Sequence, residues 1–194
     1  MRVAISLRLA QTDWGKASDY VTEAERLGVD FVWSAEAWGH DGVTPLAFVA
    51  ARTSRIRLGT GILQAGTRTP ALLAMTAMSL NAMSGGRFVL GLGVSGPQVI
   101  EGWHGIRFDR PVLRMRETVE IVRPRDRGER VEYKGRVYEL PLPGGEGKAI
   151  RSAAPPQPGV PIYLATLSPR SLDMTGQIAD GWLGTPLMPD HARV

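Results

Sequence analysis

The sequence is organised by one repeated unit, a short apolar run followed by a helix-forming segment, which recurs through roughly the first half of the chain. The apolar runs cover residues 3–7, 31–34 and 56–63, and a fourth begins at Phe88. Runs this short and this apolar are typical of parallel strands buried on both faces, with the helices as crossovers between them. The pattern predicts an α/β fold, either a (β/α)₈ barrel of the TIM type or an open doubly wound sheet.

In both architectures ligands bind at the edge of the sheet where the parallel strands end. The candidate site residues on the first strands are therefore Ser34–Glu36, Thr60–Ile62 and Gly93–Gly96. Glycines there would let a ligand approach the backbone closely.

Gly91, Gly93 and Gly96 also fit the G-x-G-x-x-G pattern of dinucleotide-binding folds. That pattern belongs near the start of a domain, opens a helix and is followed about 20 residues later by an acidic residue. Here it lies in the middle of the chain and runs into residues 98–105, which we expect to form a loop. We interpret the segment as one more strand and loop of the series, and not as a dinucleotide site.

Two helix starts combine a capping residue with proline at the first helical position, Thr44-Pro45 and Thr69-Pro70. The helix that follows Thr69 is apolar nearly all round, so we expect neighbouring protein to cover most of its surface. Its methionines are then packing residues: Met75, Met78 and Met83.

Past Pro97 the sequence becomes less regular. Residues 114–122 predict a helix that Pro124 ends early, since proline lacks the backbone N–H that a helix needs. Residues 131–140 read as two short strands around a Lys134-Gly135 turn, which predicts a hairpin.

A proline- and glycine-rich connection over residues 141–161 follows the hairpin. After it come a strand at 161–166, a helix at 169–179 that starts from Ser168, and a sixth strand at 182–185. We expect six strand-helix units of a TIM-type (β/α)₈ barrel in a single, partial domain over residues 1–194, with an irregular insertion around residues 125–160.

Composition narrows the classes of function. The net charge is +4, but the arginines are spread along the chain without interleaved aromatic residues, which argues against nucleic-acid binding. The chain has no cysteine, and its three histidines (His40, His104 and His191) lack metal-ligand spacing, so we expect no metal site. Neither a signal peptide nor an apolar run of about 18 residues is visible, so we expect a cytoplasmic protein with no membrane partner.

The motifs taken together are distinctive. They are Phe31-Val-Trp-Ser-Ala-Glu-Ala-Trp38, Thr44-Pro-Leu-Ala47, Arg57-Leu-Gly-Thr-Gly-Ile62, Thr67-Arg-Thr-Pro70, Ser84-Gly-Gly-Arg-Phe-Val-Leu-Gly-Leu-Gly-Val-Ser-Gly-Pro97, Glu101-Gly-Trp-His-Gly105, Pro161-Ile-Tyr-Leu-Ala165 and Ile178-Ala-Asp-Gly-Trp182. In this order they resemble the luciferase-like monooxygenase superfamily, in particular its coenzyme F420-dependent branch.

The resemblance implies a TIM barrel with the deazaflavin F420, or alternatively FMN, lying across the strand ends. It implies a non-proline cis peptide bond at Gly61–Ile62 and an acid/base role for Glu36 beside the ring. It also suggests that Trp38 and Trp103 wall the substrate side, although packing would equally explain such residues. The implied cofactor-binding residues are Ser34, Gly61, Ile62, Gly93, Val94, Ser95, Ala165, Thr166, Leu167 and Ser168.

The implied activity is hydride transfer between F420 and a small organic substrate. One alternative is an FMN-dependent monooxygenase, and a second is a non-catalytic fragment or interaction module. The second arises because members of the family run well past this length and strands seven and eight are missing, so we expect a chain shortened at its carboxyl end. The exposed sheet edges also leave open a homo-oligomer in which another chain completes the barrel.

Overall fold

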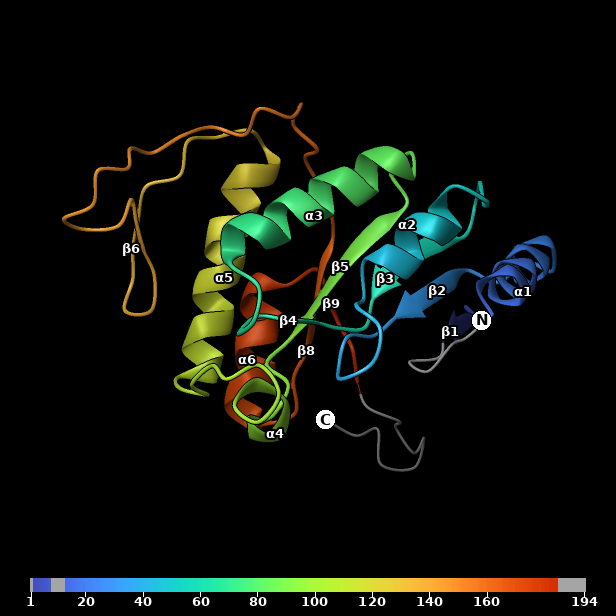
Figure 1. The fold of residues 1–194 in the computed structure, drawn as a ribbon, viewed down its shortest axis with the longest axis horizontal. Helices are drawn as coiled ribbons and strands as arrows, with labels where there is room; N and C mark the ends of the chain where they lie inside the picture. The colour runs from blue at the N-terminus through green and yellow to red at the C-terminus, as the bar shows by residue number, and fades with distance from the viewer. Residues whose placement is uncertain (1, 8–12, 185–194) are drawn as a thin grey trace.

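The computed structural model describes residues 2–7 and 13–184, in which one parallel sheet carries helices around its outside (Figure 1). The strands are β1 (Ala4–Ser6), β2 (Phe31–Ser34), β3 (Arg57–Thr60), β4 (Leu63–Gln64), β5 (Phe88–Gly93), β6 (Tyr133–Lys134), β7 (Glu139–Leu140), β8 (Ile162–Ala165) and β9 (Gly181–Trp182). The helices are α1 (Trp14–Arg26), α2 (Thr44–Ala50), α3 (Pro70–Met83), α4 (Pro97–Ile100), α5 (Pro111–Asp126) and α6 (Pro169–Ile178).

The strand order decides between the two expected architectures. The main path of the sheet is β1-β2-β3-β5-β8-β9, every neighbouring pair is parallel, and β4 also pairs with β5. A doubly wound sheet reverses its strand order at a switch point, whereas here the order never reverses. The described strands therefore form part of a TIM-type barrel, with the predicted six strands along the main path.

The third predicted strand is divided in two. Residues 56–63 form β3 and then β4, with Gly61 and Ile62 between them and a cis peptide bond joining those two residues. The cis bond lies where the family resemblance implied it.

Side chains cap the first turns of α1, α3 and α6, so not every cap lies where the sequence suggested. Thr69 caps α3 by accepting a hydrogen bond from Leu72 N–H at 3.2 Å, as predicted. Thr44 is not a cap, because it is already helical and the Asp41 carboxylate accepts its N–H at 2.8 Å. Asp41 also accepts the N–H of Val43. The capping role predicted for Thr44 therefore belongs to Asp41, three residues earlier.

The core lies between the sheet and the helices that cover it. Leu58, Leu90 and Leu92 on the strands are fully buried and belong to one cluster with residues of α3 and α5. Figure 1 shows α3 and α5 crossing close to each other on the same side of β5.

The expectation that α3 is covered on most sides is wrong for two of its methionines. Met78 is buried, but the side chains of Met75 and Met83 are 59% and 61% exposed. Helix α3 packs against β5, α2 and α5, and these neighbours leave its outward side open.

Helix α5 is longer than predicted at both ends, since it begins at Pro111 and continues through Pro124 to Asp126. Proline is tolerated here because it lies in the last turn of the helix, and the chain resumes hydrogen bonding when Glu129 N–H donates to the Pro124 carbonyl at 2.9 Å. A second difference is α4, a short helix that begins at Pro97 where a loop was expected.

The predicted hairpin is present as β6 and β7, but Lys134 belongs to β6 and the turn covers residues 135–138. A buried glutamate of α5 holds this turn. The carboxylate of Glu117 accepts the backbone N–H groups of Arg136, Val137 and Tyr138 at 2.8, 3.0 and 2.9 Å. Residues 141–161 contain no helix or strand, as predicted. The last described strand, β9, ends at Trp182, and the predicted end at Thr185 lies outside the described residues.

The described part of the chain holds neither a membrane-spanning helix nor a cluster of metal ligands. No helix in it is long and apolar enough to cross a membrane. No three acidic or histidine side chains in it converge closely enough to hold a metal ion.

Candidate functional site

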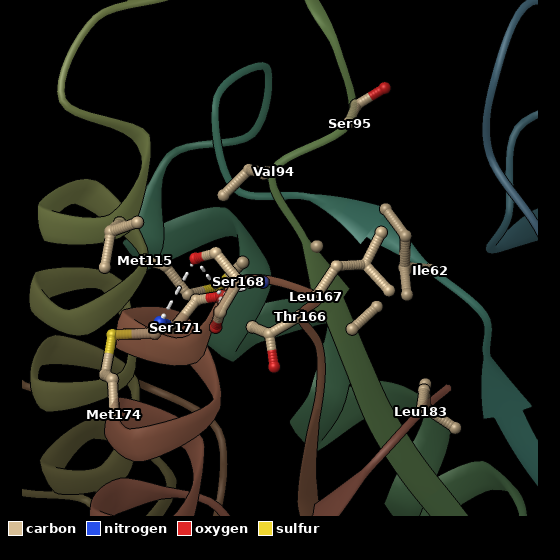
Figure 2. Close-up of a pocket in the computed structure, with 13 residues that line it drawn as sticks. Ile62, Val94, Ser95, Met115, Thr166, Leu167, Ser168, Ser171, Met174 and Leu183 are labelled. Carbon is tan, nitrogen blue, oxygen red and sulfur yellow. Dashed lines mark hydrogen bonds between the residues drawn. The ribbon is translucent and has the colours of Figure 1, made fainter. Parts of the chain in front are cut away.

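A cavity of about 350 Å³ lies at the carboxyl ends of β5 and β8 (Figure 2). Of the predicted cofactor-binding residues, those that line it are Ile62, Gly93, Val94, Ser95, Ala165, Thr166, Leu167 and Ser168. Ser34 and Gly61 do not line it; they lie behind it, where Gly61 N–H donates to the Ser34 carbonyl at 2.7 Å. The structure thus brings together side chains from segments more than 100 residues apart in the sequence.

One wall of the cavity is the side chain of Ile62, and a glycine of β5 makes room for it. A Cβ atom placed on Gly93 would lie 2.8 Å from Cγ1 of Ile62, so no larger residue fits at 93 without moving the isoleucine. The Ile62 carbonyl accepts a hydrogen bond from Glu36 N–H at 3.1 Å, which ties this wall to the end of β2.

The opposite part of the cavity is the start of α6. Ser168 and Ser171 form a reciprocal capping box in which each side chain accepts the other residue's backbone N–H. Their hydroxyl oxygens are 2.9 Å apart, and both residues line the cavity. A helix start that presents hydroxyl groups favours an anion such as a phosphate.

The inner end of the cavity is apolar and was not predicted. Val112 and Met115 of α5 contribute to it together with Met174 of α6, and Leu183 closes another side. Figure 2 shows the two methionines on one side of the cavity, with Ile62 and Leu183 on the other. No local signal marks the methionines as site residues, because their contact with the cavity depends on how α5 and α6 pack together.

A second hollow, also of about 350 Å³, surrounds Glu36. It is lined by residues of the loops that follow β2, β4 and α4, among them His40, Arg68, Trp103 and His104. Glu36 lines this hollow and Ile62 lines the cavity, and the hydrogen bond between their backbones makes the two residues direct neighbours.

Glu36 is held in a forked ion pair that the sequence did not reveal. Arg68 Nε donates to Oε1 at 2.9 Å and a terminal Arg68 nitrogen donates to Oε2 at 2.6 Å. The side chains of Glu36 and Arg68 are only 10% and 19% exposed, and Gly42 N–H donates a third hydrogen bond to Oε2 at 3.2 Å. The hydrogen bonds to Glu36 are the largest cause that raises the pKa of Arg68, so its guanidinium stays charged.

The two tryptophans that the resemblance suggested for the substrate side are not packing residues in the described part of the chain. The exposed fractions of Trp38 and Trp103 are 67% and 66%. Trp103 lines the hollow around Glu36, and both neighbours of Trp38, Ala37 and Gly39, line it as well.

Comparison with known proteins now places the chain. Its sequence matches the family "Luciferase-like monooxygenase" over residues 1–194. The chain belongs to this family. The family assignment agrees with the half-barrel, with the cis peptide bond at Gly61–Ile62 and with a cavity at the carboxyl ends of the strands.

Two luciferase-like relatives illustrate the likeness in sequence. A Mycobacterium tuberculosis protein, named as a candidate coenzyme F420-dependent oxidoreductase, is 43% identical over 94% of this chain and 56% of its own length. The 5,10-methylenetetrahydromethanopterin reductase of Archaeoglobus fulgidus is 33% identical over 84% of this chain and 47% of its own length.

A solved structure of a related enzyme is similar in fold. The coenzyme F420-dependent tetrahydromethanopterin reductase of Methanopyrus kandleri superimposes with a TM-score of 0.82 at 26% identity, over 95% of this chain and 55% of that chain. The present luciferase-like chain thus spans about half the length of the relatives that it matches.

Proposed function

We propose that this protein is an F420-dependent oxidoreductase that transfers hydride between the deazaflavin and a small organic substrate. The observation that carries the proposal is the cavity at the ends of β5 and β8, which has an apolar wall at Ile62 and a hydroxyl-lined helix start at Ser168. This combination suits a cofactor with a flat ring at one end and a phosphate group farther along. The naming of the relatives favours F420 over FMN.

In this proposal each part of the cavity has a task. Ile62 supports one face of the ring, and Gly93 keeps the space that the isoleucine needs. Ala165 at the end of β8 and the two residues after it, Thr166 and Leu167, line the middle. The loop at Val94 and Ser95 contacts the polar chain of the cofactor. Ser168 and Ser171 bind the phosphate through the start of α6.

We place the substrate in the hollow around Glu36. When bound, F420 supplies or accepts a hydride, and the substrate must gain or lose a proton in the same reaction. Oε2 of Glu36 accepts hydrogen bonds from both Arg68 and Gly42 N–H, whereas Oε1 accepts one, from Arg68. We therefore propose that Oε1 accepts the hydrogen bond of a substrate hydroxyl and exchanges the proton with it during the reaction. Trp38 and Trp103 offer exposed apolar surface at the entrance, and we propose that the substrate covers it.

The setting that we propose is the cytoplasm, with a small-molecule substrate and without nucleic acid. The arginines support the last point, because several of them are occupied in ion pairs or in contacts with aromatic rings rather than gathered on one surface.

The test is a fluorescence titration of the purified protein with oxidised F420 and, separately, with FMN. We expect saturable binding of F420 and an increase in the melting temperature, because a ligand that binds only the folded state stabilises it. Tighter binding of FMN would replace the proposal with a flavin-dependent monooxygenase. A folded protein that binds neither compound would remove the catalytic roles proposed above.

Ser171→Ala tests the position of the site, and Ser152→Ala is its control. Ser171 lines the cavity, whereas Ser152 lies in the irregular connection outside it. Only Ser171→Ala should weaken F420 binding, because the Ser171 hydroxyl holds Ser168 in place by accepting its N–H and donating to its carbonyl.

A further inference from the structure

The pairing of the sheet is interrupted beside the cofactor cavity. Backbone pairing of β3 with β5 ends at Gly59 and Val89, and pairing of β4 with β5 resumes at Leu63 and Leu92. The chain between Gly59 and Leu63 therefore leaves Leu90 and Gly91 of β5 without a partner residue in either ladder. Ile62, the proposed support of the ring, lies in this interruption.

The side chain of Thr60 supplies the missing partner. Its hydroxyl accepts a hydrogen bond from Gly91 N–H at 2.8 Å and donates one to the Gly91 carbonyl at 2.9 Å. A strand residue directs its N–H and its C=O toward the same neighbouring strand, so one hydroxyl placed between them replaces two backbone hydrogen bonds. Thr60 is fully buried, which means that no water can take over these bonds.

The glycines of β5 fit this arrangement. A Cβ atom on Gly91 would collide with the carbonyl oxygen of Thr60, and one on Gly93 would collide with the side chain of Ile62. Thr60 thus packs on Gly91, and Ile62 packs on Gly93, the next residue on the same face of β5. The position of Thr60 on Gly91 therefore sets how far the Ile62 side chain projects from β5.

We propose that Thr60 is a positioning residue for the cofactor site. Its hydroxyl fixes how far the Ile62 side chain projects from β5 into the cavity. Thr60 does not line the cavity itself and acts only through Gly91 and the chain that leads to Ile62. This inference rests on the proposed F420 site, because it assigns a role in binding that cofactor.

Three variants test the inference. Thr60→Val keeps the shape of the side chain and removes both hydrogen bonds, and Thr60→Ser keeps the hydroxyl. The matched control is Thr118→Val, since Thr118 is also fully buried but its hydroxyl binds only the Arg114 carbonyl within α5, at 2.8 Å. Each variant is titrated with F420 at a temperature at which circular dichroism shows that it is folded.

We expect Thr60→Val to weaken F420 binding about tenfold or more, and Thr60→Ser and Thr118→Val to stay within about threefold of the natural protein. Equal F420 affinities in Thr60→Val and the natural protein would overturn the inference while leaving the cofactor assignment intact. An equal loss in Thr118→Val would reduce the effect of Thr60 to general stability and would also overturn it.

A second measurement separates the inference from the proposed function. Hydrogen exchange followed by mass spectrometry reports the backbone of residues 61–65 and 90–94 without any ligand. Thr60→Val should speed exchange in these peptides at least about tenfold relative to Thr118→Val. Failure of the natural protein to bind F420 would refute the proposed function. Unchanged exchange in Thr60→Val would refute the role of Thr60 in holding Ile62, whether or not F420 binds.

Discussion

Glu36 and Arg68 show how much a single pair of residues can contribute to the site. Their forked ion pair joins the end of β2 to the loop before α3, and both side chains are largely shielded from water. A buried pair of this kind is costly to break, because the remaining partner is left with an uncompensated charge.

We therefore expect Glu36→Gln to reduce stability by about 3 kcal/mol, and to lower F420-dependent turnover by about 100-fold if Glu36 handles the proton. Urea denaturation measures the first effect and steady-state kinetics the second. The control is Glu23→Gln, since the Glu23–Arg26 pair is exposed to water and its loss should change stability far less. Full turnover in Glu36→Gln would leave the carboxylate with a purely structural role.

Asp126 is a buried acid that the proposed mechanism does not use. Its Oδ1 atom is buried and has no hydrogen-bond partner among the described residues, and burial is the main cause that raises the pKa of its carboxyl above the usual 3.8. Between pH 3.8 and the higher pKa of the folded protein, the unfolded chain has lost this proton while the folded protein keeps it. The contribution of Asp126 to stability therefore falls as the pH rises through this range.

Asp126→Asn should stabilise the protein at pH 7, because an amide in place of the carboxyl leaves no charge to be buried. At pH 3.5, where the natural carboxyl is largely protonated in both states, the difference should shrink. Thermal melts of both proteins at the two pH values measure it. A difference that is the same at both pH values would contradict the titration of Asp126.

At the level of elements, the hairpin β6–β7 depends on one side chain of a neighbouring helix. Glu117 is 3% exposed and accepts the three backbone N–H groups at the turn, and its carboxylate lies so close to Gly135 that a side chain there would collide with it. The hairpin has only a two-residue ladder of its own, so this contact with α5 decides whether it stays closed.

We expect Glu117→Gln to lower stability by about 2–3 kcal/mol, because an amide can accept only part of what the carboxylate accepts. The hairpin should also open to trypsin after Lys134 and Arg136, which limited proteolysis with mass spectrometry detects. Glu120→Gln is the control, since exposed Glu120 accepts a single bond from the Tyr133 hydroxyl. Equal resistance of the two variants to trypsin would show that Glu117 does not hold the hairpin.

The elements could be predicted well from the sequence, since buried strands and proline-marked helix starts leave local signals. Four of the predicted residues that line the cavity (Ile62, Gly93, Val94 and Ser95) could be predicted because they stand at strand ends. The other four, residues 165–168, came from the family resemblance. Arg68 was missed as the partner of Glu36, since 32 residues separate the two and only the fold brings them together. Met115 and Met174 were missed for the same reason, because nothing local distinguishes a methionine that faces a cavity from one that fills a core.

At the level of the whole molecule, the methionines report which surfaces are covered. Met75 and Met83 lie on the open side of α3, whereas Met78, Met115 and Met174 are no more than 3% exposed. Sulfur atoms that reagents can reach are oxidised first.

Brief treatment with hydrogen peroxide, followed by peptide mapping, should therefore modify Met75 and Met83 well before the other three, by about tenfold or more in rate. An unfolded sample in urea, in which all five react alike, is the control. Oxidation of Met115 and Met174 as fast as Met75 would mean that α5 and α6 do not pack as described.

The order of the strands has a consequence for how the protein is made. Along the main path from β1 to β9, each strand pairs with one that leaves the ribosome before it, apart from the detached hairpin. Growth of the sheet thus needs no later segment to be inserted between two earlier ones. The nascent chain can fold in one direction, adding strand after strand at a single growing edge while synthesis continues.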